Sequence, residues 1–238
     1  MKRPYIICHI LSSLDGKING NFMKAPLTEK YLKQYAAIRT DFQADAWAYG
    51  SRTVKEFLNN RKLKLSQPMS VVPAGDFVAK TNAQQYFVAI DTEGEIPWTE
   101  GTYKKAGRPN AHVIEIVTEG TPKEYLSHLR AIGVSYVIAG QECLDCQLAM
   151  EKLDQLFGIE KLLVCGGGRI NWTFLQQGCI DELSLVVVPI TDGSTESVTI
   201  FEQSPHWPSE DMVGFTLKNH QIIEENGFWL TYQVNNAK

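Results

Sequence analysis

Hydrophobic residues along the chain gather in short runs that are separated by stretches with helical spacing. The first run, Tyr5–Leu11, is apolar at nearly every position, which is typical of a strand buried on both faces. Similar runs predict further strands over 44–50, 86–90, 111–117, 136–139, 161–165 and 182–188. The pattern therefore predicts a sheet whose strands are largely enclosed by other elements.

Between these runs, apolar residues recur at the spacing of one face of a helix. The first such stretch ends near Arg39, and Thr28 is its expected N-cap. A second helix is expected to open at Ser51 or Arg52. Further helices are expected over 122–131, 147–157 and 169–177.

The end of the chain has a different pattern. Phe215–Ile223 and Phe228–Val234 read as two strands, and the Asn226-Gly227 pair between them is a strong hairpin signal. The region 59–84 lacks clean periodicity, although 69–74 is expected as an edge strand interrupted by proline. The region 93–110 is expected to be a polar loop.

Alternation of strands and helices followed by a hairpin indicates an α/β fold with a mostly parallel sheet and an antiparallel edge. We find no internal repeat, low-complexity segment or linker, so a single domain over residues 1–238 is expected.

Composition narrows the class of protein. The chain is 44% hydrophobic and 21% charged, as in ordinary globular proteins. Its net charge of −4 does not indicate the positively charged surface that binds nucleic acid. No apolar run approaches the roughly 18 residues of a membrane span, and Tyr5–Leu11 is short for a signal peptide. A cytoplasmic protein with no membrane or nucleic-acid partner is expected. The five cysteines are an odd, sparse set and do not indicate a disulfide scaffold.

The strongest local signal for chemistry is a glycine run. An apolar strand over 161–165 leads into Gly166, Gly167 and Gly168, and a helical pattern begins at Arg169. Glycines permit close approach of a ligand to the backbone, and the free N–H groups of a helix N-terminus suit a phosphate. The alternative is a tight strand-to-helix turn without a ligand.

Two further loops carry polar groups that could bind a ligand or its phosphate. Gly50-Ser51-Arg52-Thr53 follows a strand and combines a glycine with two hydroxyls and a fixed positive charge. Ser13, Asp15 and Lys17 leave the carboxyl end of the first strand, where open α/β sheets bind ligands. The alternatives are an ordinary helix cap and an ordinary turn.

Other motifs carry less weight. Cys143 and Cys146 form a single C-x-x-C, and without a second pair coincidence is favoured over zinc or redox chemistry. The histidines are scattered and form no metal-binding pair, so no metal site is expected.

Taken together, the loops resemble those of the riboflavin-biosynthesis reductases, which share the dihydrofolate-reductase-like fold. The resemblance rests on 13–18 after the first strand, on 45–53 around the second, on the glycine run and on 178–189. It implies a dihydrofolate-reductase-like domain, an NADPH cofactor and a homodimer. It also implies reduction of a ribosylamino-pyrimidine 5′-phosphate to its ribitylamino form. The sequence does not fix the dimer surface, but the apolar run 183–188, expected as an edge strand, is a candidate contributor.

The resemblance also implies roles for individual residues. The matching cofactor-binding positions would be Gly50, Thr53, Gly166, Gly167 and Gly168, and the chemistry of their neighbours adds Ser51, Arg52 and Arg169 as candidates. Substrate-binding positions would be Ser13, Asp15, Lys17 and Cys165. Two positions depart from the family pattern, because Phe57 and Cys165 stand where the riboflavin reductases usually carry acidic residues.

A reductase of this kind leaves the redox chemistry to its cofactor and itself orients the reactants. A proton donor is needed near the acceptor atom. Asp15 is the first candidate, for this role or for substrate anchoring; water is the alternative, and Glu56 is a weaker candidate. Two other functions stay open on the sequence: a nucleotide-binding or regulatory paralogue without turnover, and a dihydrofolate-type reductase.

Overall fold

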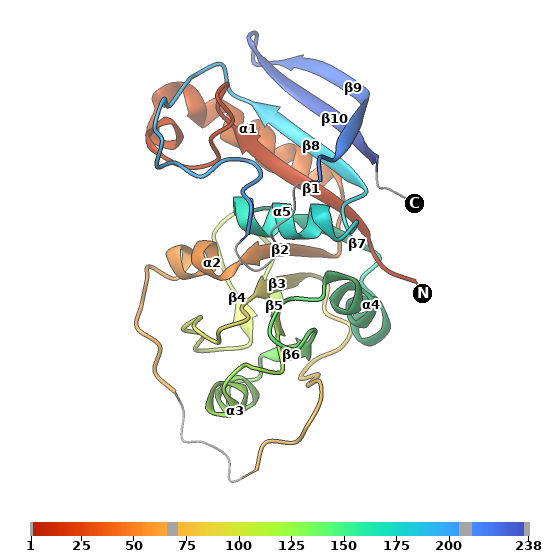
Figure 1. Ribbon diagram of the computed structural model, residues 1–238. Coiled ribbons are helices and arrows are strands. Elements are labelled where there is room, and N and C mark those ends of the chain that lie inside the picture. Colours follow the sequence, from red (N-terminus) through yellow and green to blue (C-terminus); the bar gives the residue numbers. More distant parts are fainter. Residues whose placement is uncertain (1, 66–70, 205–210, 236–238) are drawn as a thin grey trace. The chain divides into compact units, whose positions relative to one another are not determined.

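The computed structural model describes residues 2–65, 71–204 and 211–235, which form helices and strands in alternation (Figure 1). The chain divides into two compact units. The first comprises Met1–Pro4 and Asp45–Leu162, and the second comprises Tyr5–Ala44 and Leu163–Lys238. Strand β7 (Lys161–Val164) contains the boundary between them. Two compact units do not distinguish one domain from two, so the single domain stays a prediction.

The first unit is built on parallel strands. Its strands are β2 (Ala46–Gly50), β3 (Tyr86–Ile90), β4 (Thr102–Tyr103), β5 (Ala111–Val117) and β6 (Ser135–Ile138). β2 pairs with β3, β3 with β5 and β5 with β6, all in parallel, while β4 is antiparallel to β5. Its helices are α2 (Ser51–Phe57), α3 (Lys123–Ala131) and α4 (Cys146–Phe157).

The second unit combines a parallel pair with an antiparallel hairpin. Its strands are β1 (Tyr5–Ser12), β8 (Glu182–Val187), β9 (Gly214–Ile223) and β10 (Gly227–Asn235). β8 lies between β1, with which it is parallel, and β10, with which it is antiparallel; β9 pairs with β10 only. The helices are the 3-10 helix η1 (Asn21–Lys24), α1 (Pro26–Asp41) and α5 (Gly168–Gln176).

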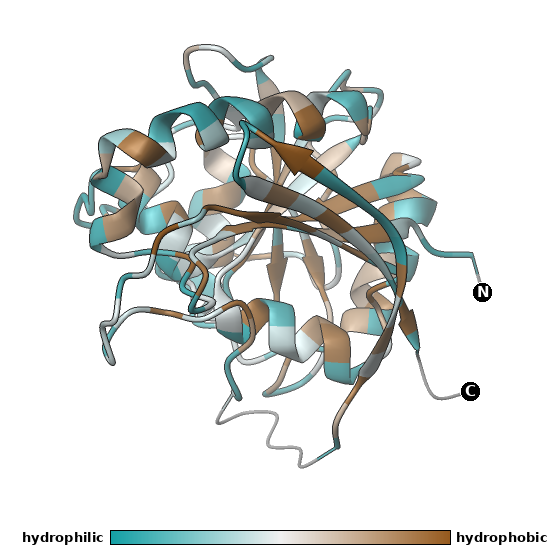
Figure 2. Cartoon of the chain, turned by 90° about the horizontal axis from the view of Figure 1, so that it is seen from above, coloured by the Kyte–Doolittle hydropathy of each residue, from teal (hydrophilic) through white to brown (hydrophobic). Residues whose placement is uncertain are grey.

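Helix α1 covers one face of the β1–β8 pair. Tyr31 and Ile38 of the helix are buried against Leu11 of β1 and against Val186 and Val188 at the end of β8. Figure 2 colours the ribbon by residue hydropathy, and both hydrophobic (brown) and hydrophilic (teal) positions occur along the helices. Burial of this one helical face is what the spacing of its apolar residues predicts.

An aspartate fixes the start of a strand in each unit. The Asp45 carboxylate accepts hydrogen bonds from the amides of Glu160 and Lys161, each at 2.9 Å. The Asp181 carboxylate accepts one from the Ile6 amide at 2.7 Å, and the Asp181 amide donates to the Ile6 carbonyl. Because backbone groups at strand ends lack ladder partners, these carboxylates satisfy donors that would otherwise be unpaired.

The α/β class predicted from the sequence is confirmed, with mostly parallel strands and a C-terminal antiparallel hairpin. Helix and strand positions agree with the pattern to within one or two residues for most elements. A short strand, β4, lies within the region expected to be a loop. Of the edge strand expected over 69–74, residues 71–74 are not a strand, and the rest lies outside the described residues.

Two finer expectations were wrong. Thr28 does not cap α1, since Ala25 is the N-cap and Pro26 the first helical residue. Buried within the first turn, Thr28 instead donates its hydroxyl hydrogen to the Phe22 carbonyl at 2.6 Å, tying the helix to η1. The apolar run 183–188 was expected to be an edge strand, but β8 has a partner on both sides.

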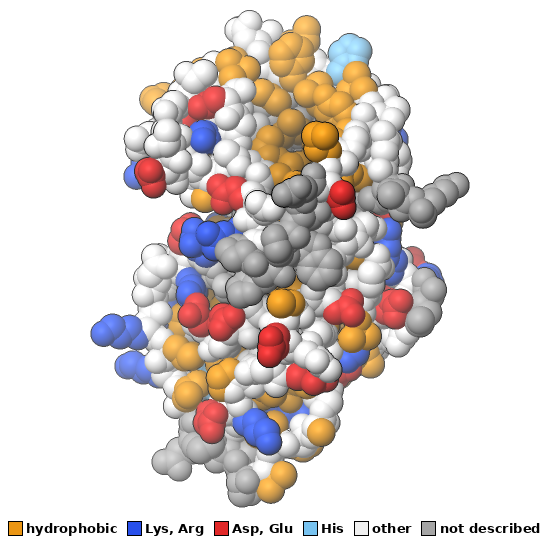
Figure 3. Space-filling model, viewed as in Figure 1, with side chains coloured by type: hydrophobic (Ala, Val, Ile, Leu, Met, Phe, Trp, Pro, Cys, Tyr) orange, Lys and Arg blue, Asp and Glu red, His pale blue; other side chains and the backbone are white. Residues whose placement is uncertain are grey.

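The edge strand of the second unit is β9, and its surface is exposed. Leu217 and Ile222 of β9 and Phe228 of β10 are the large hydrophobic side chains of this hairpin that are most open to solvent. Figure 3 shows hydrophobic side chains gathered over the region where Figure 1 labels β9 and β10. In the parts of the chain that the structure describes, no helix has both the length and the apolar character needed to cross a membrane.

We expect Gly227→Ala to destabilise the protein by about 1 to 3 kcal/mol through overpacking. A Cβ atom at this position would lie 2.2 Å from the Tyr31 ring and 2.9 Å from the Val187 carbonyl oxygen. Gly214→Ala, in the same hairpin, is the control, because its Cβ would meet only the Asn235 side chain, at 3.3 Å. Urea denaturation measures both, and equal stability of the two variants would contradict the packing argument.

Candidate functional site

The loop after β1 is held by its own backbone and by a buried serine. Ser13 is buried, and its amide donates to the Lys17 carbonyl at 2.9 Å. The Ser13 hydroxyl accepts a bond from the Lys17 amide at 3.0 Å and donates to Asp15 Oδ1 at 2.6 Å. The loop is therefore a closed turn, and the hydroxyl of Ser13 is committed to it.

Asp15 joins this loop to a second one. Its carboxylate accepts hydrogen bonds from the amides of Asp192, at 3.1 Å, and Gly193, at 2.8 Å. The Ser13 hydroxyl and these two amides lower the pKa of Asp15 to about 2. A carboxyl group with this pKa is ionised at neutral pH and does not donate a proton in this conformation. The geometry therefore disfavours proton donation by Asp15 and shows it anchoring the second loop, while substrate anchoring by Asp15 stays a prediction.

The second loop, 190–202, was not singled out from the sequence. It runs beside the first loop through backbone hydrogen bonds: Leu14 donates to Ile190, Ile18 donates to Val198, and Ile200 donates to Gly16. Its sequence, Thr191-Asp192-Gly193-Ser194-Thr195, is a cluster of turn residues. That composition was the available signal, but it does not say which loop the segment contacts.

The glycine run lies against the same segment. Gly168 is the first residue of α5, and a Cβ atom there would lie 2.4 Å from the Thr199 carbonyl oxygen. The Glu202 amide donates to the Gly168 carbonyl at 3.1 Å, and Asn171 of α5 donates from its side chain to the Ile200 carbonyl at 2.8 Å. Only glycine permits this approach of two backbones. The 190–202 segment thus joins two loops predicted from the sequence, 13–18 and the glycine run.

The N-terminus of α5 is open to an anion. Gly167 is its N-cap, no side chain caps the helix, and the first turn holds no acidic residue. In the described parts of the chain, no acceptor pairs with the amides of Gly168, Arg169 or Ile170. Free amides and the helix dipole favour a phosphate at such a position. Arg169 is exposed beside it, so these residues fit the phosphate of a nucleotide cofactor.

The remaining residues of the run have distinct environments. Gly166 has a φ of 104°, which favours glycine, and the Gly166–Gly167 peptide bond is cis. Cys165 is a free, half-buried thiol. The fully buried thiol of Cys8 has a raised pKa, mainly because of burial and also because of Cys165, so Cys8 is inert.

The loop after β2 belongs to the first unit. Gly50 is the N-cap of α2, in extended conformation, and Ser51, Arg52 and Thr53 form the first turn, which contains no acidic residue. Arg52 is exposed, while Ser51 and Thr53 are half-buried. The loop thus offers the groups that the sequence predicted, and its role in cofactor binding stays a prediction.

Glu56 is the weaker candidate proton donor, and Phe57 occupies a position that is usually acidic in the riboflavin reductases. Glu56 is exposed. Phe57 packs edge-on against Tyr49, with ring centroids 5.1 Å apart, and the Lys105 ammonium lies 4.6 Å from its ring centroid. The ammonium group of Lys105 therefore makes a cation–π contact with Phe57. A carboxylate at position 57 would form an ion pair with it instead. This position therefore has a different chemistry from the usual family pattern.

The C-x-x-C motif lies at the start of α4 in the first unit. Cys146 is buried as the first residue of the helix, Cys143 is exposed, and both are free thiols. The N-cap is Asp145, whose carboxylate accepts a bond from the Leu148 amide at 2.9 Å. Among the residues that the structure describes, no group of three His, Cys, Asp or Glu side chains has the arrangement of a metal site.

We expect Asp15→Asn to accelerate amide exchange in residues 190–200 by roughly tenfold, because charge-assisted hydrogen bonds are lost. The pKa of Asp15 is lowered, so this stabilisation is present above 3.8 and fades as the pH falls towards about 2. Hydrogen–deuterium exchange with mass spectrometry measures both effects. Glu196→Gln, an exposed carboxylate on the same segment, is the control; equal exchange in the two variants would contradict the clamp.

The sequence is similar to a known protein family and to named reductases. The family described as RibD C-terminal domain matches residues 4–225. Over 93% of both sequences, the chain is 24% identical to an Aquifex aeolicus (strain VF5) protein, 2,5-diamino-6-ribosylamino-4(3H)-pyrimidinone 5′-phosphate reductase. A protein of the same name from Methanothermobacter thermautotrophicus is 25% identical, with 94% of this chain and 95% of that protein covered.

Solved structures agree on the fold. A pyrimidine reductase-like protein from Corynebacterium diphtheriae has a TM-score of 0.67 at 14% identity, with 98% of this chain and 93% of that chain covered. One form of RibD from Acinetobacter baumannii has a TM-score of 0.61 at 22% identity, with 98% of this chain and 59% of that chain covered. At these identities the likeness establishes the fold alone.

Proposed function

This chain belongs to the RibD C-terminal domain family, and on that premise we propose that it is an NADPH-dependent reductase of riboflavin biosynthesis. Its substrate would be a ribosylamino-pyrimidine 5′-phosphate and its product the ribitylamino form. The observation that carries the proposal is the match to reductases along nearly the whole of both sequences. The names of these relatives make the diaminopyrimidinone phosphate the first substrate to test.

The N-terminus of α5 supports the choice of a nucleotide cofactor. Its unpaired amides, its uncapped end and the exposed Arg169 suit a phosphate group. In the first unit, Gly50–Thr53 offers a second set of donors, with Arg52 as its fixed charge. NADPH rather than NADH stays a prediction, with Arg52 and Arg169 as the candidates to meet the 2′-phosphate.

The chain's own part in the reaction is positional. When bound, NADPH would supply a hydride to the ribosyl C1′, and the ring oxygen released from that carbon would need one proton. Asp15 holds the 190–202 segment against the loop after β1, so that Lys17 and the glycine run keep fixed positions. Because Asp15 is ionised, we assign the proton to water.

Neither alternative function from the sequence is favoured by the comparisons. A binding or regulatory paralogue without turnover has no relative among those described above, which carry reductase names. The dihydrofolate-type reductase shares the fold, but fold alone does not establish its reaction. A homodimer and a cytoplasmic location stay proposals; the exposed β9–β10 surface is the apolar face that a second copy would cover.

Turnover is tested with purified protein, NADPH and the diaminopyrimidinone or aminouracil phosphate, followed by the loss of absorbance at about 340 nm. We expect reduction of one of the two, slower reduction with NADH and no reduction of dihydrofolate. Tight NADPH binding with no turnover on either pyrimidine would contradict the proposal and favour the binding paralogue.

The cofactor position is tested by Gly167→Asp and Gly167→Asn. Both residues are good N-caps, and the φ of −76° at Gly167 accepts a side chain, so both variants should fold. They are nearly equal in size and differ in charge. We expect Asp to weaken NADPH binding by at least about tenfold more than Asn, because a carboxylate repels the phosphate. Equal affinities in a fluorescence titration would contradict the assignment.

A further inference from the structure

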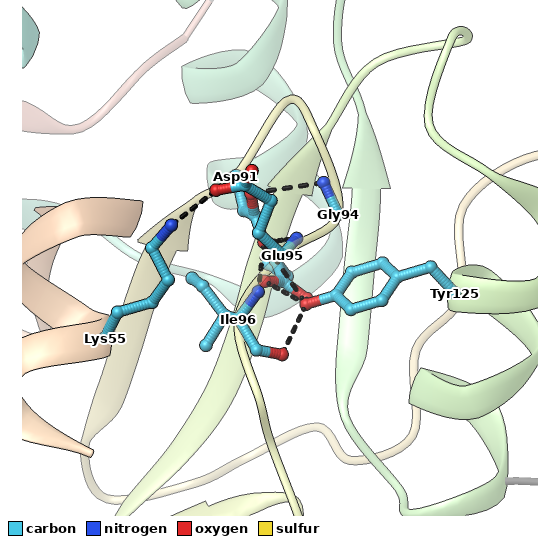
Figure 4. Close-up of polar contacts among 7 residues, drawn as sticks. Lys55, Asp91, Gly94, Glu95, Ile96 and Tyr125 are labelled. Atoms are coloured by element: carbon cyan, nitrogen blue, oxygen red, sulfur yellow. Dashed lines mark hydrogen bonds and ion pairs between the residues drawn. The ribbon is translucent and has the colours of Figure 1, made fainter. Parts of the chain in front are cut away.

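Two carboxyl groups and a phenol are buried together in the first unit, away from the residues assigned above. Asp91 follows β3, Glu115 lies within β5, and Tyr125 belongs to α3; none is more than 1% exposed. The Tyr125 hydroxyl lies 2.9 and 3.0 Å from the Glu115 carboxyl oxygens and 3.2 Å from Asp91 Oδ2. Figure 4 shows Asp91 and Tyr125 pointing toward one another.

The contacts around the Tyr125 hydroxyl require an additional proton. Four acceptor oxygens surround it, because the Ile96 carbonyl also lies at 3.0 Å. A phenol has one hydrogen to donate, so with both carboxyls ionised its lone pairs would face negatively charged oxygens. A proton on one carboxyl group turns one of these contacts into a second hydrogen bond. The geometry therefore calls for one neutral carboxylic acid in the cluster.

Glu115 is the group that holds this proton. Asp91 accepts three backbone hydrogen bonds, from Gly94 at 3.1 Å, Glu95 at 2.7 Å and Ile96 at 2.8 Å, and these favour its ionised form. Among the described residues, Glu115 accepts one N–H, from the Trp98 indole at 3.2 Å. Burial, and then the charge of Asp91, raise the pKa of Glu115 well above its ordinary value.

Other ionisable groups near the cluster do not replace this proton. The side chains of Glu93 and Glu95 are exposed, and Glu95 pairs with Lys55 of α2. His128 of α3 uses Nε2 to contact the Trp98 carbonyl at 3.0 Å, with its ring centroid 6.5 Å from that of Tyr125. In the described residues, no cation is hydrogen-bonded to Glu115 or Asp91. Neutralisation of the pair therefore depends on the proton.

The cluster determines the shape of the loop Asp91–Ile96, which we call the Asp91 loop. Its three amides point to Asp91, and Ile96 also accepts from Tyr125 (Figure 4). Gly94 has a φ of +72°, and a Cβ atom there would lie 2.9 Å from the Tyr125 ring, so this close approach of the loop to the ring requires glycine. Loss of the Glu115 proton would place two negative charges beside the ring and its hydroxyl.

We infer that the Asp91 loop is a proton-dependent latch, closed while Glu115 carries its proton and opened when that proton is lost. The 94–96 end of the loop is the part that yields, because its amides are bonded to Asp91, one of the two carboxyls that would repel each other. The Thr92 end is held separately by the Thr118 and Thr121 hydroxyls. Opening carries Glu95 away from Lys55, so α2 loses this partner. If Gly50–Thr53 binds the cofactor, opening of the latch would make the position of that loop depend on pH. This last consequence rests on the proposed function.

Hydrogen exchange of the full chain tests the latch without any ligand. In an open loop Glu115 is solvated and ionised at neutral pH, so each opening releases one proton. We expect protection factors of the Gly94, Glu95 and Ile96 amides to fall by up to tenfold per pH unit between about pH 6 and 8. Amides of β3 and of β1 should keep their protection over the same range.

Glu115→Gln is the decisive variant, since glutamine keeps a donor and cannot ionise. We expect its loop protection to be independent of pH. If this variant does not fold, Tyr125→Phe takes its place, with loop protection below that of the wild type at every pH. A wild-type loop with constant protection, a slope retained in Glu115→Gln, or one slope shared by every amide would overturn the latch.

Discussion

The close contact between Gly168 and the Thr199 carbonyl is the constraint on which the candidate site depends. A side chain at position 168 would occupy the place of the Thr199 backbone. Because the two backbones touch, the 190–202 segment can lie on the N-terminus of α5 while its other edge pairs with the loop after β1. Asp15 strengthens that second contact with an ionised carboxylate. Three segments far apart in the sequence thereby lie together, with the N-terminus of α5 among them.

The same chain uses carboxylates in two electrostatic states. Asp45 and Asp181 accept hydrogen bonds from backbone amides at strand ends. Asp15 accepts them from the 190–202 segment, and these bonds lower its pKa to about 2. Glu115 is the opposite case, because it is fully buried and faces another carboxyl group. Environment rather than residue type decides between these states. A buried neutral acid gives the first unit a sensitivity to pH that its surface charges do not provide.

Much of the fold was predictable from the sequence, since buried strands and one-sided helices leave regular hydrophobic patterns. The glycine run and the loop after β1 were predictable as well, because turn chemistry is local. Their joining segment was not, because 190–202 has no periodicity and one of its partners, the loop after β1, lies about 180 residues away, as the Asp15–Gly193 contact shows. Glu115 did leave a signal, a charged residue within the apolar run 111–117, but its partners Asp91 and Tyr125 are brought together only by folding.

The destination of the hydride tests the central claim most directly. The protein would be incubated with the diaminopyrimidinone phosphate and with NADPH deuterated at the transferred position of the nicotinamide C4, and the product examined by mass spectrometry and proton NMR. The account predicts a ribitylamino product that carries deuterium at C1′. Recovery of unreduced substrate, or of a reduced product without deuterium at that carbon, would contradict it.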